Sequence, residues 1–89
     1  MAQSIDIEAH RETFRRIAAL MDPFNPKGVT ITPQTTFAGD LDLDSLAVMD
    51  LVAAIEDEFD IVIPLNILPE LETVGEVAAA VDRIREESR

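Results

Sequence analysis

The stretch Gly39-Asp40-Leu41-Asp42-Leu43-Asp44-Ser45-Leu46 decides how the chain folds, because a loop turns into a helix there. The Asp44 carboxylate can accept hydrogen bonds from the free N–H groups of a first helical turn, and it complements the positive end of the helix dipole. Ser45 is then expected to be the first helical residue, with its hydroxyl pointing to solvent. Apolar residues follow at helical spacing as far as Phe59.

The helix that starts here is expected to span residues 45–59 and to have two different faces. Its inward face consists of Val48, Leu51, Val52, Ile55 and Phe59. Leu46 and Met49 fall on the other face, beside Ser45. Two exposed apolar side chains next to an exposed serine indicate a contact surface.

Upstream of this stretch, the sequence predicts a first helix. It begins at Ser4 or Asp6 and ends near Met21, because a proline follows shortly after and residues before proline avoid helical geometry. Its apolar residues recur at steps of three and four, which gives one buried stripe. On the polar side, Glu12 and Arg16 have the spacing of a favourable ion pair.

The segments that connect the helices are expected to be ordered. The long loop over residues 23–44 carries apolar side chains that can hold it on the core, with Phe37 as the expected anchor. Ile61-Val62-Ile63-Pro64 has the composition of a strand, but no second strand is available, so it is interpreted as an extended connector. Residues 65–71 can form a short helical turn, interrupted by Pro69.

A last helix is announced by Thr73-Val74-Gly75-Glu76, which is a capping box. Val77, Val81 and Ile84 continue the apolar stripe of this helix. The sequence therefore predicts an all-α fold, a small four-helix bundle with three main helices, a short third helix and a long first loop. We expect residues 1–89 to form a single domain.

The bulk composition excludes several classes of function. The net charge is −11, and no Lys or Arg lies between Gly28 and Asp82, so nucleic acid is a poor partner. A partner with a basic patch fits this charge, although the charge could also serve solubility alone. The absence of cysteine excludes disulfides and thiolate metal sites. No apolar run is long enough to span a bilayer and no secretory pattern begins the chain, so a soluble cytoplasmic protein is expected.

Two kinds of site chemistry do not fit this chain. Asp40, Asp42 and Asp44 open like a calcium-binding EF-hand loop, but Ser45 and Leu51 occupy the positions where that loop needs glycine and glutamate, so we expect no metal site. A serine nucleophile needs a nearby base. The only histidine, His10, lies in the first helix and is expected to be a solvated surface residue.

Several segments, taken together, match a known family. They are Phe37-Ala38-Gly39-Asp40-Leu41, Asp44-Ser45-Leu46, Leu51-Val52, Ala54-Ile55-Glu56-Asp57-Glu58-Phe59-Asp60, Ile63-Pro64 and Leu71-Glu72-Thr73-Val74. With these segments at these spacings, the chain resembles the acyl carrier proteins over most of its length. The Asp-Ser-Leu tripeptide alone would be weak support for this.

The resemblance implies a four-helix carrier without enzymatic activity. A phosphopantetheinyl transferase would attach 4′-phosphopantetheine from coenzyme A to Ser45, and Asp44 would help to dock that transferase. The terminal thiol of the arm would hold acyl groups as thioesters, which supplies the sulfur that the chain lacks. The carrier would shuttle these groups between acyl-loading and acyl-accepting enzymes of fatty-acid or specialised lipid synthesis.

The resemblance also implies two sets of contact residues. Basic patches and apolar hollows of partner enzymes would meet the outer face of the second helix, which consists of Leu46, Met49, Asp50, Ala53, Glu56 and Asp57. A fatty chain would be sheltered in a space lined or bordered by Phe59, Ile63, Leu68, Leu71 and Val74. We expect the carrier to be a monomer.

The third helix departs from the family pattern, which is usually acidic there. Leu65 and Ile67 stand in a segment that is almost free of charge. One interpretation is a dedicated partner with an apolar surface, for which an acyltransferase that works at the membrane is a candidate. The other is that both side chains fold inward over a larger core.

Two other functions remain open from the sequence. The chain could be an aminoacyl or peptidyl carrier that delivers amino acids. It could also be a structural module that binds partners through its acidic helix and never carries the arm.

Overall fold

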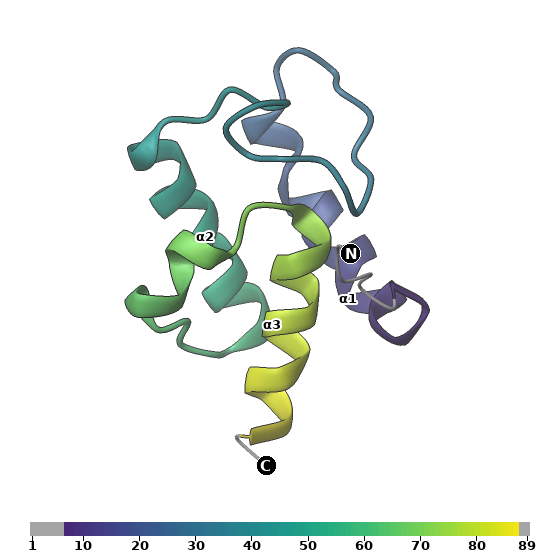
Figure 1. The fold of residues 1–89 in the computed structure, drawn as a ribbon, viewed down its shortest axis with the longest axis vertical. Helices are drawn as coiled ribbons and strands as arrows, with labels where there is room; N and C mark the ends of the chain where they lie inside the picture. Colours follow the sequence, from purple (N-terminus) through teal and green to yellow (C-terminus); the bar gives the residue numbers. More distant parts are fainter. Residues whose placement is uncertain (1–6, 88–89) are drawn as a thin grey trace.

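A computed structural model describes residues 7–87, and within that range the fold is all-helical (Figure 1). The elements are η1 (Ile7–His10), α1 (Arg11–Leu20), η2 (Asp22–Phe24), α2 (Ser45–Phe59), η3 (Leu65–Glu70) and α3 (Val74–Glu87), where η denotes a 3₁₀ helix. This confirms the predicted all-α fold with three main helices and a short one. The starts predicted at Ser4 and Asp6 lie outside the described residues. No helix in residues 7–87 is long and apolar enough to cross a membrane.

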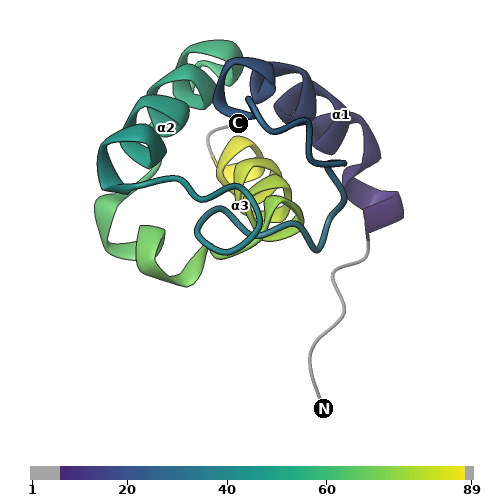
Figure 2. The same cartoon turned by 90° about the horizontal axis from the view of Figure 1, so that it is seen from above.

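The three α-helices enclose one apolar core. Seen from above, α3 lies between α1 and α2, while η3 lies beside α2 (Figure 2). The fully buried large side chains come from all three helices and from the residue that caps the end of α1; they are Ile17, Met21, Leu51, Ile55, Val74 and Val81. The apolar stripes predicted for the helices therefore face one another, and their burial is the main stabilising term of the fold.

One predicted contact of α1 is wrong. Arg16 does not form its ion pair within α1 with Glu12; its guanidinium lies 2.8 Å from Oε2 of Glu58 on α2. The guanidinium also lies over the Phe59 ring, with its carbon 4.3 Å from the ring centroid. A cation–π contact and an ion pair from one side chain favour this position over an exposed pair along the helix.

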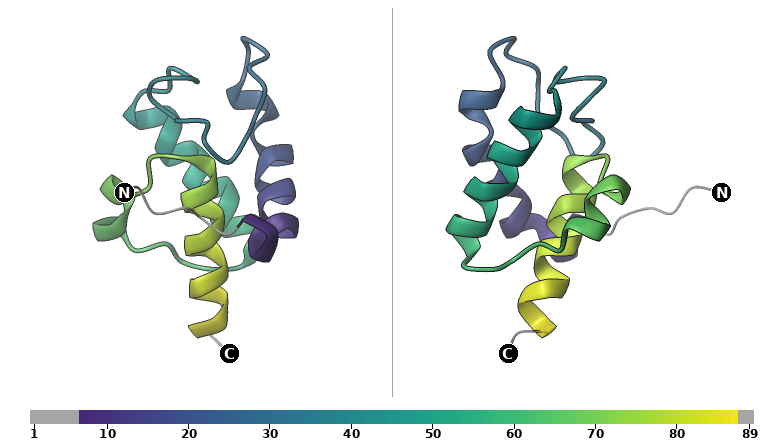
Figure 3. Two further views of the ribbon diagram at one scale, coloured as in Figure 1. Left: turned by 45° about the vertical axis from the view of Figure 1, so that its right-hand side comes forward. Right: turned by 90° about the vertical axis from the view of Figure 1, so that its left-hand side faces the viewer.

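The long loop is held on the beginning of α3, which explains why so many residues without helix are ordered. The Phe37 N–H donates to the Glu72 carbonyl at 3.3 Å, and the Gly75 N–H donates to the Pro33 carbonyl at 2.9 Å. Figure 3 shows the loop descending toward the first turn of α3. A side chain at Gly75 would place its Cβ 2.9 Å from the Pro33 carbonyl oxygen, so this approach requires glycine. Phe37 is 7% exposed, which confirms it as the anchor.

The segment between α2 and α3 follows the sequence prediction closely. α2 ends at Phe59, and its C-cap Asp60 has a left-handed backbone with φ of 55°. Residues 61–64 form neither helix nor strand. The capping box is confirmed by reciprocal hydrogen bonds. The Thr73 N–H donates to the Glu76 carboxylate at 3.0 Å, and the Glu76 N–H donates to the Thr73 hydroxyl at 3.2 Å.

Candidate functional site

Ser45 lies where the long loop enters α2, and its position is set by the residue before it. Asp44 is the N-cap of α2, with extended backbone, and its Oδ1 accepts a hydrogen bond from the Ala47 N–H at 2.8 Å. The Asp44 carbonyl accepts from the Val48 N–H at 3.0 Å. Ser45 is therefore the first residue of α2, and it is exposed. The predicted cap and the predicted exposure are both present.

The loop that precedes Ser45 is fixed by side chains of two kinds. Leu41 is 4% exposed and anchors the loop in the core. The Asp40 carboxylate accepts from the Thr36 N–H at 2.9 Å, and Asp42 lies 3.5 Å from the Lys27 ammonium. Asp40 and Asp42 thus each have a partner of their own. Ser45 therefore follows a loop that is held in place by side-chain contacts.

The outer face of α2 carries apolar and acidic side chains below Ser45. Leu46 is 72% exposed and Met49 is 44% exposed. Further along the helix, Asp50, Ala53 and Asp57 are exposed as well. Their spacing of three and four residues places them on one side of the helix. The structure therefore brings five of the six predicted contact residues of α2 to one surface.

Glu56, the sixth of these residues, has a different environment. It is half-buried, and its Oε2 accepts a hydrogen bond from the Ile63 N–H at 2.8 Å. Because a buried backbone N–H needs a partner, this contact holds the connector after α2 in place. The structure assigns Glu56 a supporting contact that the sequence did not indicate.

Replacing Glu56 with alanine is expected to lower the free energy of unfolding by about 1–2 kcal/mol, since a charge-assisted hydrogen bond to a half-buried N–H is lost. Urea unfolding measures this difference. The matched control is Asp57→Ala, one residue further on, where the exposed carboxylate should change stability by less than about 0.5 kcal/mol. Equal effects of the two changes would contradict a structural role for Glu56.

The two apolar residues singled out in η3 have different positions. Leu65 is 68% exposed, whereas Ile67 is half-buried and packs against the core. The inward alternative therefore holds for Ile67 and fails for Leu65. Val62, in the connector between α2 and η3, is 78% exposed, and it was not identified from the sequence as an exposed apolar residue. The alternation in Ile61-Val62-Ile63, with both isoleucines turned inward, is the signal that could have found it.

A small, partly open apolar cavity lies between α2, α3 and the segments on either side of η3. It measures about 20 Å³ and is bounded by α2 side chains together with Phe37, Ile63, Leu71 and Val77. This volume holds about one water molecule and no alkyl chain. An open groove of about 390 Å³ adjoins it, and the two share Phe37, Val48 and Leu71 as walls. An alkyl chain that enters the groove would have to displace these side chains to reach the cavity.

The residues predicted to shelter a fatty chain do not all lie at this cavity. Ile63 and Leu71 line it, whereas Phe59, Leu68 and Val74 do not. Phe59 lies at the other end of α2, where the guanidinium carbons of Arg16 and Arg85 are 4.3 Å and 5.3 Å from its ring centroid. Its environment is that of a core residue covered by cations.

The prediction for His10 is wrong. Its side chain is 22% exposed, and Nδ1 lies 2.7 Å from Oδ2 of Asp82 on α3. The Thr13 hydroxyl donates to the other oxygen of the same carboxylate. His10 therefore ties the beginning of the described chain to α3. Local sequence patterns do not indicate this contact, because His10 and Asp82 are far apart along the chain.

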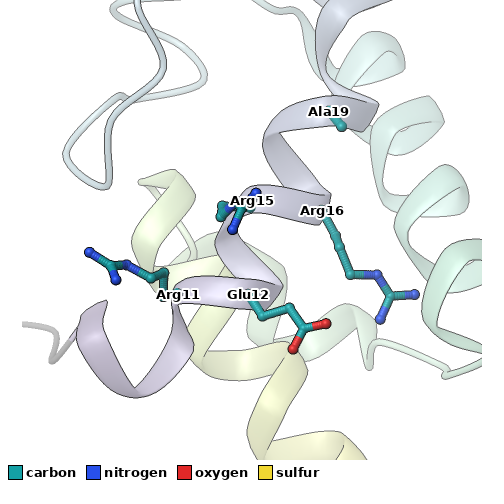
Figure 4. Close-up of a pocket in the computed structure, with 5 residues that line it drawn as sticks. All are labelled: Arg11, Glu12, Arg15, Arg16 and Ala19. Carbon is teal, nitrogen blue, oxygen red and sulfur yellow. The ribbon is translucent and has the colours of Figure 1, made fainter.

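A larger hollow of about 460 Å³ lies on the outer side of α1, and its lining residues are Arg11, Glu12, Arg15, Arg16 and Ala19 (Figure 4). Figure 4 shows Arg11 and Arg16 pointing in different directions, and Arg16 is engaged with Glu58. No residue of the Ser45 site lines this hollow. It is a surface depression between diverging side chains.

Comparison with known proteins places the chain among carriers. Residues 12–81 match a domain family described as "Phosphopantetheine attachment site". An acyl carrier protein from Picosynechococcus sp. is 38% identical over 68 residues, which cover 75% of this chain and 84% of that protein. The meromycolate extension acyl carrier protein of Mycobacterium tuberculosis is 40% identical over 58 residues, which cover 65% of this chain and 50% of that protein. The corresponding protein of Mycolicibacterium smegmatis is 38% identical over 58 residues, 65% of this chain and 59% of that protein.

Proposed function

The chain belongs to the phosphopantetheine attachment family of acyl carrier proteins, and from this premise we propose that Ser45 carries the 4′-phosphopantetheine group. The family consists of carriers that are not enzymes and that have this group as their cofactor. The observation that carries the assignment to Ser45 is its exposure as the first residue of a capped helix.

The surroundings of Ser45 fit a phosphodiester. The group would place a negative charge at the first turn of α2, where the helix dipole is positive. The Asp44 carboxylate is already occupied by the Ala47 N–H, so it fixes the helix start beside the serine. We propose that this exposed carboxylate also contributes to docking the transferase. When bound, the group supplies a thiol, which the chain, having no cysteine, does not contain.

We propose that the cargo is a fatty acyl chain for fatty-acid or specialised lipid synthesis. Apolar walls support this choice, since Phe37, Val48 and Leu71 bound both the open groove and the small cavity. Some relatives are named for meromycolate extension, and this favours a specialised lipid pathway as one version of the proposal. The chain spans about half the length of the Mycobacterium tuberculosis relative it matches, so that pathway is inferred from the shared part only.

Members of this family interact with a phosphopantetheinyl transferase and with enzymes of fatty-acid synthesis. For this chain we propose that the outer face of α2 receives them. Asp50 and Asp57 are exposed and would meet basic patches, while Leu46 and Met49 would meet apolar hollows. Glu56 is not included among the charged residues that contact partners, because its carboxylate accepts a hydrogen bond from the Ile63 N–H.

The cargo can be identified on protein purified from its native cell. Hydroxylamine releases a thioester-bound group, and mass spectrometry of the released group is expected to show a fatty acyl species. An amino acid would indicate an aminoacyl or peptidyl carrier instead. A native protein that bears no phosphopantetheine at all would contradict carriage and favour a structural module.

A further inference from the structure

Asp42 has an unusual backbone conformation for a residue with a side chain. Its φ is 56°, in the left-handed region that glycine adopts freely and that other residues adopt rarely. Asp42 belongs to the loop that leads into α2, and it precedes the exposed Ser45 by three residues. In Figure 1 the loop enters α2 at the upper end of this helix. Aspartate tolerates the left-handed region better than most residues do, but the surrounding structure still has to hold it there.

Contacts on both sides of Asp42 hold this conformation. The Leu41 N–H donates to the Thr36 carbonyl at 3.2 Å, and the Leu43 N–H donates to the Phe37 carbonyl at 2.9 Å. Leu41 is buried, and Leu43 packs against the core. The chain is therefore fixed immediately before and immediately after Asp42. A residue that avoids the left-handed region could be accommodated here only if these neighbours moved.

The carboxylate of Asp42 contributes less to the loop than its backbone does. It lies 3.5 Å from the Lys27 ammonium, and both side chains are largely exposed to solvent. An exposed ion pair of this kind adds little stability, because solvent screens it and two side chains have to be ordered. We therefore expect the left-handed conformation, and not the carboxylate, to set the course of the loop.

We propose that Asp42 is a positioning residue for the attachment of phosphopantetheine to Ser45. This inference rests on the proposed carrier function. Asp44, the N-cap of α2, lies two residues after Asp42, so a shift of the loop at Asp42 is passed on to the cap and to the serine beside it.

The attachment step explains why such a shift would lower the rate. The Ser45 oxygen forms a bond to the phosphorus of coenzyme A that carries the pantetheine, and the bond from this phosphorus to adenosine bisphosphate breaks. The serine proton passes to a base of the transferase. A small displacement of reacting atoms slows such a transfer strongly, because the attacking oxygen has to be aligned with the bond that breaks.

The test measures the kinetics of a phosphopantetheinyl transferase with coenzyme A and the full-length chain. Asp42→Val is expected to lower kcat about tenfold and to change KM by less than about twofold, because the serine is displaced while the outer face of α2 remains. Asp42→Gly removes the same carboxylate but adopts the left-handed region freely, so its kcat should stay within about twofold of the wild type. The two variants separate the backbone conformation from the charge.

Asp60→Val is the matched control. Asp60 also has a left-handed backbone, with φ of 55°, but it follows the other end of α2, a helix of 15 residues that is about 22 Å long. The same strain is then introduced far from Ser45. We expect Asp60→Val to lower the Tm about as much as Asp42→Val does and to leave kcat unchanged. Circular dichroism checks folding, and Asp42→Ala replaces Asp42→Val in the comparison where the valine variant does not fold.

Three results would overturn the inference. The first is a kcat of Asp42→Val equal to that of the wild type. The second is an equal loss of kcat in Asp42→Val and Asp60→Val, because stability alone would then set the rate. The third is a loss in Asp42→Gly as large as that in Asp42→Val, because the carboxylate would then be the cause. Failure of the carrier function itself is recognised separately, since the wild type would then gain no phosphopantetheine mass.

Discussion

Replacing Phe59 with alanine is expected to lower the free energy of unfolding by about 3–5 kcal/mol, because a buried aromatic ring is removed and leaves a cavity. Phe59 is 7% exposed and ends the inward face of α2. Arg16 from α1 and Arg85 from α3 place their guanidinium groups over its ring, so the side chain joins all three main helices. Since small domains have only about 5–15 kcal/mol of stability, this loss would be a large fraction of the total.

Urea unfolding followed by circular dichroism measures this loss. Each kcal/mol corresponds to about 4–8 °C in Tm for a domain of this size, so thermal melting should show the change clearly. Leu65→Ala is the control, because its side chain is 68% exposed and its truncation should cost less than about 0.5 kcal/mol. A loss below about 1 kcal/mol for Phe59→Ala would show that the ring is not part of the core.

The Ser45→Ala variant is expected to gain no phosphopantetheine when it is co-expressed with a broad-specificity transferase. The group attaches through the serine oxygen, and alanine removes that atom. Intact-mass measurement should show one added phosphopantetheine on the wild type and none on the variant. The folded structure should be unaffected, since Ser45 is exposed and the cap is provided by the neighbouring Asp44.

Ser4→Ala is the matched control for this loss, because it removes the same atom from another serine of the chain. It should be loaded as fully as the wild type. Phosphopantetheine on Ser45→Ala would contradict the assignment of the attachment residue. Loss of loading in both variants would point to a defect outside Ser45.

The elements of the fold were predictable where a local rule governs them. The start of α2 follows from the chemistry of Asp44, and its length follows from the apolar spacing up to Phe59. The reciprocal bonds between Thr73 and Glu76 likewise follow from a pattern of four residues. The exposure of Ser45, on which the candidate site depends, could be predicted for the same reason.

Contacts between distant segments could not be predicted from local patterns. Arg16 pairs with Glu58, and His10 binds Asp82, because helix packing brings these side chains together. Helical spacing by itself predicts only contacts between residues of the same helix. Glu56 is a similar case, since its hydrogen bond to Ile63 depends on how the chain turns after α2.

Which apolar side chains after α2 are exposed could not be predicted from the sequence, for a different reason. Leu65 and Ile67 have similar composition around them, yet the first is exposed and the second packs against the core. Val62 would have been identified from the period-two pattern of an extended chain, but a connector without a strand partner does not require that pattern.

The most direct test of the central claim is to locate the prosthetic group on the wild-type protein by fragmentation mass spectrometry, after loading with the transferase and coenzyme A. We predict that the phosphopantetheine mass lies on Ser45. The mass on any other residue, or no added mass after complete reaction of a known carrier in the same tube, would contradict the claim.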